Sequence, residues 1–534
     1  MKKLCWFFLP APAGKKNQKQ FFHPLLSPLR GEKGAGGMRE QYGLDKARDG
    51  QLVPVMASLG LTTKKERRVH LLRYMIRQID AEAKISETVR LEALETTVPH
   101  ATIQAVVRDH HVERQRDRKL SAEMGLLLII AMNLFSRSSL SQVLWKLVQG
   151  LRFVWPKAAF TPATKGAISQ LRYALGAKVM VDLYHRVCRP MARADTPGAF
   201  WKGLRLMGLD GTEETVADTP ENARFFGRHS NGWGEVSFPQ FRALYLVEIG
   251  THAVVDAGVW PLHRGEKEIG QRLLRTLETG MLLMWDCGFH SYAMVRRALQ
   301  TGAHILCRLP ANVRVEVIRP LPDCSYLIEL VERDHKGLPK MGSAIRLRLI
   351  EYTVSDPALP GFGERRRLIT SLLDCEAYPA LELARLYHER WEVEITIDET
   401  DTHQRQAYHP FRSLKPVGVI QEFFGLLIAH YAIRKIMLDA AEYADLDPDQ
   451  LSFTQALELI QAAIPEFQQI DPAQLPERYV QLLVDIALFR LPPRAVRSNP
   501  RVVKRKSSKF NHKRLEHLNW PQPTCSFSEA IALI

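Results

Sequence analysis

Two aspartates stand in settings that suit metal-binding carboxylates. Asp210 follows the apolar run at residues 204–209, and Asp286 follows the apolar run at residues 281–285. Each pattern predicts a buried strand that carries a carboxylate to its end. An aspartate before or near glycine is also a common turn former, so neither residue identifies a site on its own.

A third acid, Glu394, belongs to a different kind of element. Steps of three and four residues place Tyr387, Arg390 and Glu394 on one face of a predicted helix. Two strand-end aspartates and a helical glutamate can hold two divalent ions about 3.5–4 Å apart, an arrangement that supports in-line attack on phosphodiesters.

The elements that must position these acids alternate between strands and helices. Residues 241–247 and 253–259 predict two strands, and an amphipathic helix with Ile269, Leu273 and Leu277 on its inner face precedes the Asp286 strand. This order is the one that an α/β fold with a ribonuclease-H-like core requires. Residues 311–372 alternate apolar and charged side chains, which predicts a β-rich insertion before the glutamate helix.

The chain divides into six predicted regions. Its 534 residues exceed what one hydrophobic core usually contains. The predicted regions are a disordered or non-native extension (1–45), a helical N-terminal DNA-binding domain (46–190), the first part of the core (191–310), the β-rich insertion (311–372), the last part of the core with the glutamate helix (373–440), and a helical C-terminal region with a basic tail (441–534). Within the second region, residues 91–120 fit either a DNA-contacting helix-turn-helix or a plain helical bundle.

Charge points to a polyanionic partner. The formal net charge is +15, and neutralising phosphates on a nucleic acid releases counterions and strengthens binding. The alternative is that the excess charge is only solvated surface. The tail shows the same ambiguity, because Lys504, Arg505 and Lys506 suit a segment that tracks a DNA backbone but also suit a solvated tail.

Other classes of function are less well supported. The seven cysteines form no CxxC pair, which argues against structural zinc and fits a reducing cytoplasm. There is no GxSxG elbow and no GxxxxGK[ST] loop. The short apolar start of the chain makes a poor export signal, and the apolar segments at 126–132 and 423–431 are predicted to be core helices rather than membrane spans.

Several blocks together resemble the insertion-sequence-four family of DDE transposases. They are Asp210-Gly211-Thr212, residues 218–222, residues 225–228, residues 285–292, residues 308–312 and the Tyr387-x2-Arg390-x3-Glu394 signature. The resemblance runs from about residue 60 to 515, and the last signature is its most specific part. It implies a ribonuclease-H-like fold with a β insertion, and a cut-and-paste enzyme that binds terminal inverted repeats of double-stranded DNA, cleaves them and transfers the strand to a target.

The resemblance also implies roles for individual residues. Asp210, Asp286 and Glu394 are the expected catalytic residues and ligands of two Mg²⁺ ions, with Mn²⁺ as a possible substitute. Arg390 is expected to hold a DNA phosphate or orient Glu394, and Tyr387 either to contact a phosphate or to pack in the core. Pairing two DNA ends implies a homodimer, and the protein is expected at the bacterial nucleoid in the cytoplasm, without a membrane.

One position departs from the family. The signature continues seven residues after its glutamate with a lysine that contacts transposon-end DNA, and this chain has Asp401 there. An anion in place of a phosphate-binding cation should weaken DNA positioning by charge repulsion. Arg405 is a neighbour that can substitute for the lysine. This departure makes an impaired DNA-binding remnant of a transposase one alternative. A ribonuclease-H-fold nuclease outside transposition is a further alternative.

Overall fold

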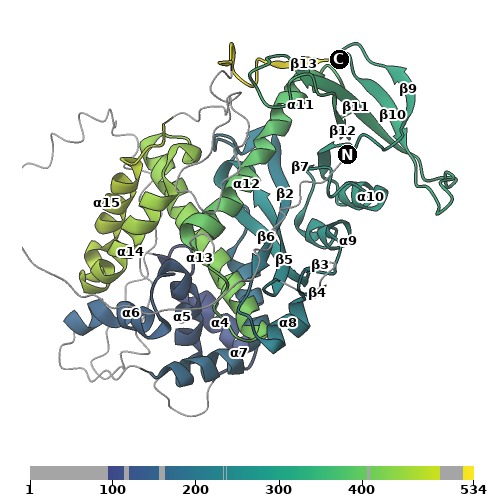
Figure 1. Ribbon diagram of the computed structural model, residues 1–534. Coiled ribbons are helices and arrows are strands. Elements are labelled where there is room, and N and C mark those ends of the chain that lie inside the picture. The colour runs from purple at the N-terminus through teal and green to yellow at the C-terminus, as the bar shows by residue number, and fades with distance from the viewer. Residues whose placement is uncertain are drawn as a thin grey trace, which may run out of the picture. The chain divides into compact units, whose positions relative to one another are not determined.

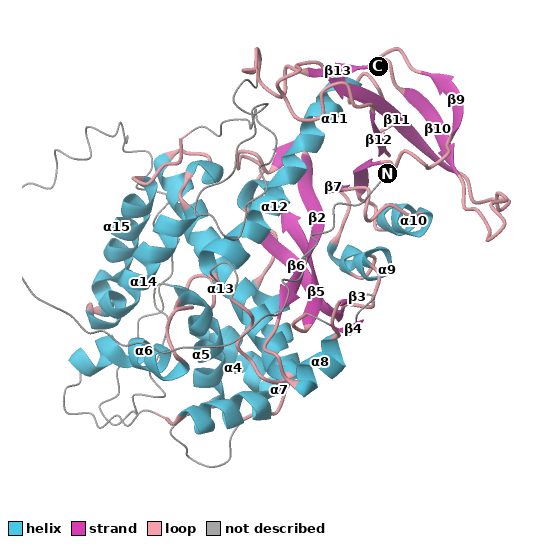
Figure 2. Cartoon of the chain, viewed as in Figure 1, coloured by secondary structure: helices cyan, strands magenta, loops and turns pink. Residues whose placement is uncertain are grey.

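The computed structural model describes residues 94–113, 120–154, 163–231, 234–235, 237–405, 409–492 and 521–534. Within them, one sheet of eleven strands is flanked by helices (Figure 1), (Figure 2). The predicted N-terminal extension and the basic tail at 501–514 lie outside the described residues. The domain boundaries given above remain predictions.

The first five strands of the main path form the core of the sheet in the order β6-β5-β2-β7-β8. β5 runs antiparallel to β2 and to β6, whereas β7 runs parallel to β2 and to β8. Three antiparallel strands followed by two parallel ones in this order are the ribonuclease-H-like topology, so the predicted fold class is confirmed. The strands are β2 (Leu204–Thr215), β5 (Gln240–Glu248), β6 (Ala253–Pro261), β7 (Met281–Trp285) and β8 (His304–Arg308).

Residues of the predicted insertion extend this same sheet. β12 (Arg366–Thr370) pairs antiparallel with β8, and β11 (Ile345–Val354), β10 (Tyr326–Leu330) and β9 (Glu316–Pro320) follow in turn. The C-terminal strand β13 (Ile531–Leu533) pairs with the far end of β11, at Tyr352 to Val354. The insertion and the end of the chain are therefore built onto the catalytic sheet. The short strands are β1 (Phe200–Trp201), β3 (Ser230–Asn231) and β4 (Gly234–Glu235).

The two faces of the sheet are covered by different helices. On one face, Leu206, Met284 and Leu306 pack with Leu383 and Tyr387. These last two come from α11 (Ala380–Leu386) and η4 (Tyr387–Arg390), which continue into α12 (Trp391–Asp398) and the π-helical segment η5 (Glu399–Gln404). The other face is covered by α9 (Glu266–Gly270), η3 (Leu273–Thr276) and α10 (Tyr292–Gln300). The single amphipathic helix predicted before the Asp286 strand is thus two short ones, although Ile269, Leu273 and Leu277 are buried as expected.

A long helix, α13 (Pro416–Ala444), lies at the centre of the helical region. It is long and apolar enough to cross a membrane by composition, but 83% of its apolar window is buried within the protein. Buried α5 and α13 occupy the two apolar segments that were predicted as core helices. Around α13 lie α5 (Ala122–Leu134), α7 (Lys165–Val187), α14 (Phe453–Gln469) and α15 (Leu475–Ala487), and α6 (Leu140–Val154) packs against α14 and α5. The remaining helices are α4 (His100–Asp109), α8 (Pro220–Phe226), η2 (Ile249–Thr251), η6 (Pro448–Gln450) and η7 (Pro472–Gln474).

N-terminal and C-terminal helices pack against each other although hundreds of residues separate them. Gln468 on α14 donates to the carbonyl of Leu147 on α6 at 2.8 Å, and Gln461 donates to the carbonyl of Leu134. The helix-turn-helix suggested for residues 91–120 stays a prediction, because α4 lies in this range but residues 114–119 are outside the described part of the chain.

Candidate active site

Strand register brings the two aspartates side by side. Leu209 on β2 pairs with Trp285 on β7, so the next residues, Asp210 and Asp286, are neighbours in the following row. They share a row of a parallel pair, so their side chains leave the same face of the sheet. Asp286 follows the last residue of β7, as predicted.

Asp210 lies in the middle of its strand, which corrects the sequence-based expectation of a strand end. β2 continues to Thr215 because β5 supplies antiparallel partners from Met207 to Thr215. The Gly211-Thr212 pair that suggested a turn is therefore extended strand. It is the parallel pairing with the shorter β7 that stops at Leu209, and Asp210 lies just past that point.

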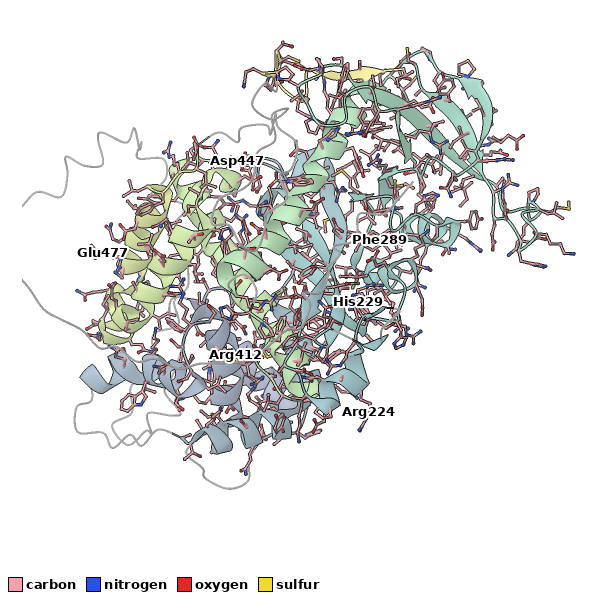
Figure 3. All side chains as sticks on the ribbon, in the orientation of Figure 1. Arg224, His229, Phe289, Arg412, Asp447 and Glu477 are labelled. Atoms are coloured by element: carbon pink, nitrogen blue, oxygen red, sulfur yellow. The ribbon has the colours of Figure 1, made fainter. Side chains whose placement is uncertain are left out.

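A tight loop holds the Asp286 carboxylate. Its Oδ1 accepts a hydrogen bond from the backbone N–H of Gly288 at 2.8 Å. A Cβ atom at residue 288 would lie only 3.0 Å from the same oxygen, so glycine allows this close return of the chain. The following Phe289, labelled in Figure 3, is buried and its ring lies against Gly270 of α9.

Arg390 joins the glutamate helix to the central strand. Its Nη2 donates to Glu394 Oε1 at 2.8 Å, and its Nη1 donates to Asp210 Oδ2 at 2.9 Å. Glu394 lies on α12, one helical turn after Arg390, as the predicted spacing requires. The arginine thus holds two of the three acids, which lie 184 positions apart in the sequence.

Tyr387 holds the backbone next to Asp286. Its side chain is buried, and its hydroxyl donates to the carbonyl of Trp285, the residue before Asp286, at 3.2 Å. Burial raises the pKa of Tyr387 well above its ordinary value, so the phenol is neutral. Of the two expected roles, packing in the core is the one this geometry supports.

The acids influence one another electrostatically. Burial raises the pKa of Asp210 to about 6, against the lowering effects of Arg390 and of the Gly211 N–H. Asp286 and Glu394 raise the pKa of Asp210 further, because their negative charges lie near it. Three carboxylates together are a donor set that fits hard divalent cations, which prefer oxygen ligands.

Arg308 is a residue of this site that the sequence interpretation did not assign. Trp285 pairs with Cys307 on β8, so Arg308 occupies the same row as Asp210 and Asp286. Its charge also contributes to the low pKa of His388, which is about 4, mainly because of burial and then of Arg366, Arg390 and Arg308. The motif at 308–312 was visible in the sequence, but the register that places Arg308 beside the acids was not.

The comparisons with known proteins agree with this geometry. Residues 88–185 match the family described as insertion element 4 transposase N-terminal, and residues 201–432 match the transposase DDE domain. The chain belongs to the insertion-sequence-four family of transposases. The transposase is therefore a DNA-cleaving and DNA-transferring enzyme that uses a divalent metal and acts on DNA.

Two relatives from Escherichia coli (strain K12) show the extent of the similarity. The transposase InsG for insertion sequence element IS4 is 28% identical over 404 residues, which cover 74% of this chain and 88% of that protein. The putative transposase InsZ is 23% identical over 219 residues, or 38% of this chain and 73% of that protein. A solved piggyBac transposase synaptic complex with hairpin DNA is 12% identical, with a TM-score of 0.38 over 76% of this chain and 86% of that chain.

The transposase's unusual Asp401 lies in an internal charge cluster. Asp401 Oδ1 is 3.4 Å from Arg405 Nη2, and the same nitrogen bonds Glu214 on β2. Glu214 is buried, and its pKa is raised well above the ordinary value by burial and then by Asp401, while Arg405 lowers it. Arg405 is only 13% exposed and neutralises these two acids, so it is not positioned as a free substitute for the family lysine.

The remaining expected DNA contacts, Lys504, Arg505 and Lys506, lie outside the described residues. The described chain resumes at residue 521 and returns to the sheet as β13. The basic segment is thus followed by an anchored strand rather than by a free end.

Proposed function

We propose that this transposase cleaves DNA at the ends of its insertion sequence and transfers the freed 3′-hydroxyl to a target, with Asp210, Asp286 and Glu394 as ligands of two Mg²⁺ ions. The observation that carries the proposal is that Arg390 joins Asp210 and Glu394 while strand register places Asp286 next to Asp210. When bound, two such ions, or Mn²⁺ in their place, would activate the attacking water or 3′-hydroxyl and stabilise the leaving oxygen.

The protein's own residues prepare the site for this chemistry. Arg390 balances Asp210 and Glu394 before a metal binds, and it is placed to contact a DNA phosphate when a metal takes over that balance. Arg308, in the same row as the two aspartates, adds a second cation for the DNA backbone. Tyr387 and Gly288 fix the backbone around Asp286, so that its carboxylate does not have to reorganise.

Partners and location follow from the same proposal. The DNA substrates are the terminal inverted repeats and the target duplex, and the basic segment with Lys504, Arg505 and Lys506 adds backbone contacts to them. Two ends must be joined in one reaction, which favours a homodimer on DNA. The nucleoid of the bacterial cytoplasm is where such a substrate is available.

End cleavage tests the proposal directly. Purified protein is incubated with Mg²⁺ and a duplex that carries the inverted repeat flanking the gene, and nicked and strand-transfer products are separated on denaturing gels. Asp210→Asn and Glu394→Gln should abolish cleavage but keep end binding, whereas Asp485→Asn on α15 serves as a charge-matched control outside the site. Cleavage that persists in either active-site variant would contradict the assignment of these acids as metal ligands. Cleavage by the unaltered protein without strand transfer would identify a nuclease.

A second candidate, a DNA-binding remnant without cleavage, is favoured by Asp401 alone. Asp401→Lys replaces an anion beside Glu214 with a cation that pairs with it. Cleavage in this variant only would support the remnant, whereas cleavage by the unaltered chain would show that the Arg405 cluster tolerates Asp401.

A further inference from the structure

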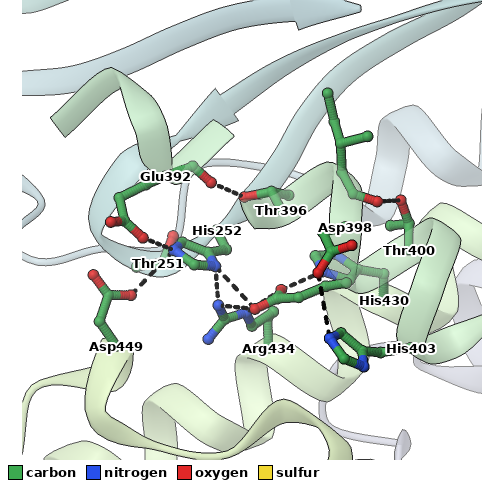
Figure 4. Close-up of polar contacts among 12 residues, drawn as sticks. Thr251, His252, Glu392, Thr396, Asp398, Thr400, His403, His430, Arg434 and Asp449 are labelled. Carbon is green, nitrogen blue, oxygen red and sulfur yellow. Dashed lines mark hydrogen bonds and ion pairs between the residues drawn. The ribbon is translucent and has the colours of Figure 1, made fainter. Parts of the chain in front are cut away.

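The helix that carries Glu394 is also held from behind, by a buried network of charges centred on His252 (Figure 4). The His252 side chain is fully buried. Its Nε2 lies 2.9 Å from Glu392 Oε2 and 3.1 Å from Asp449 Oδ1, and its Nδ1 lies 3.2 Å from Glu399 Oε1. One imidazole therefore contacts carboxylates from α12, η5 and η6.

Helix geometry puts these contacts opposite the active site. Glu392 precedes Glu394 by two residues, which is about 200° around a helix of 3.6 residues per turn. Glu399 follows Glu392 by seven residues, or roughly two turns, and so returns to nearly the same face. His252 thus bridges the carboxylates of Glu392 and Glu399 on one face of the helix, and Glu394 lies on the opposite face, toward the active site.

α13 closes the network on the other side. Arg434 donates to both oxygens of Glu399, at 2.9 Å from Nε and 2.5 Å from Nη2, and its Nη2 also contacts His252 Nδ1. His430 Nε2 lies 3.0 Å from Glu399 Oε2. Each acid therefore depends on buried partners, and removing one partner leaves a buried charge without compensation.

The backbone of His252 is held in an unfavourable conformation. Its φ of 57° is in the left-handed region, between η2 and the first residue of β6. A residue with a side chain rarely adopts this conformation, and such strain persists where the surrounding structure fixes it. At His252 this backbone conformation directs the imidazole toward the face of α12 that lies opposite Glu394.

We infer that His252 is a positioning residue for the active site. By bridging Glu392, Glu399 and Asp449, it sets the rotation and height of α12 and so aims Glu394 at the site shared with Asp210 and Asp286. The inference rests on the proposed function, since it assumes that Glu394 is a metal ligand. It extends that function to a residue that contacts the face of α12 opposite Glu394.

The test compares two substitutions of His252 in the full-length protein. In His252→Leu the ring nitrogens are lost, whereas the amide of His252→Gln can still donate to Glu392 and accept from Arg434. The readouts are end cleavage as a function of Mg²⁺ concentration, Mn²⁺ binding by electron paramagnetic resonance, and the Kd for end DNA. Residues that orient metal ligands typically change metal affinity by about 10- to 100-fold when they are lost.

The expected result is specific to the metal site. His252→Leu should weaken Mn²⁺ binding and raise the half-saturating Mg²⁺ concentration by at least about 10-fold, with the Kd for DNA within about twofold of the unaltered protein. His252→Gln should restore most of both metal readouts. The matched control is Asp256→Asn on β6, the strand that follows His252. Asp256 is a buried acid bonded to His185, Arg275 and Thr276, so this variant should lower thermal stability but leave the metal readouts unchanged.

Three results would overturn the inference: a folded His252→Leu protein with unaltered metal binding, a His252→Gln protein as defective as His252→Leu, or the same metal defect in Asp256→Asn. If His252→Leu does not fold, Glu392→Gln takes its place under the same criteria. A wild-type protein that binds Mn²⁺ but does not cleave would contradict the proposed function, and the Mn²⁺ comparison between variants would still decide the role of His252.

Discussion

Arg390 Nη1 donates to Asp210 Oδ2 at 2.9 Å, and this contact fastens the glutamate helix to the central strand. The same guanidinium reaches Glu394, so one side chain sets the spacing between two of the three acids. A planar group with two parallel donors fixes angle as well as distance. Arg390 therefore holds the glutamate helix and the central strand in one arrangement.

Replacing Arg390 by lysine should damage the site although the charge is kept. A single ammonium cannot hold both carboxylates in one plane, so at least one charge-assisted hydrogen bond is lost. A loss of about 1.5–3 kcal/mol corresponds to cleavage that is roughly 10- to 100-fold slower. Single-turnover end cleavage measures this effect, and Arg297→Lys on the exposed side of α10 is the control. Equal rates for both variants would show that Arg390 acts only as a point charge.

Asp210→Asn should raise the stability of the metal-free protein at neutral pH. The pKa of Asp210 is raised from 3.8 to about 6, chiefly by burial, so the folded state binds this proton more tightly than the unfolded state does. Its contribution to stability is complete below pH 4 and is lost as the pH rises through 6, a difference of up to about 3 kcal/mol. Without divalent ions, the Asp210→Asn variant should have a higher melting temperature than the unaltered chain at pH 7.5 and the same melting temperature at pH 4. Added Mg²⁺ should stabilise only the unaltered chain, and a variant that is less stable at pH 7.5 would contradict this account.

The sequence predicts the acids because their signals are local. An apolar run before Asp286 and the three- and four-residue steps to Glu394 depend only on neighbouring residues, and both elements lie where they were predicted. Asp210 was misplaced within its strand because its pairing beyond Leu209 depends on β5, more than 25 residues later. Local patterns do not contain that partner.

Relationships across the sheet and between helices could not be predicted in the same way. Arg308 joins the acids only through the register between β7 and β8, and His252 meets Glu392 across 140 residues. The strands at 316–370 alternate clearly in sequence, yet only their pairing with β8 shows that they extend the catalytic sheet. Such information resides in three-dimensional packing rather than in periodicity.

Gly208 should prove essential for the position of the glutamate helix. A Cβ atom at residue 208 would lie 2.2 Å from Cγ2 of Val393, the residue before Glu394. Gly208→Ala should push α12 away from β2, at a cost of about 1–3 kcal/mol in stability and with cleavage at least about 10-fold slower. Val393→Ala removes the obstructing methyl groups, so the double variant should recover part of the lost activity. No recovery would indicate that the defect arises elsewhere.

His388 should make the fold sensitive to acid. Burial and the charges of Arg366, Arg390 and Arg308 lower its pKa from 6.5 to about 4, so the folded state keeps the imidazole neutral. The unfolded state binds the proton more readily, and the stabilisation present above pH 6.5 is lost as the pH falls toward 4. His388→Phe keeps an aromatic ring next to Phe527 and removes this titration. Its melting temperature should fall less than that of the unaltered chain between pH 7 and pH 5, and an equal fall would exclude His388 as a source of the sensitivity.

Phe527, near the C-terminus, should help to hold η4 and Arg390 in place. Its ring lies edge-on to His388 with centroids 4.5 Å apart, and Arg385 donates to the nearby carbonyl of Ser528 at 3.0 Å. Because β13 fixes this segment on β11, the aromatic contact supports η4, the short helix that ends at Arg390. Phe527→Ala should cost about 0.5–3 kcal/mol and slow cleavage more than it weakens end binding, since the residue supports Arg390 rather than DNA. Half-exposed Ile534→Ala is the control for altering the C-terminus, and a Phe527→Ala protein that cleaves at the normal rate would show that β13 alone is enough to hold the helix.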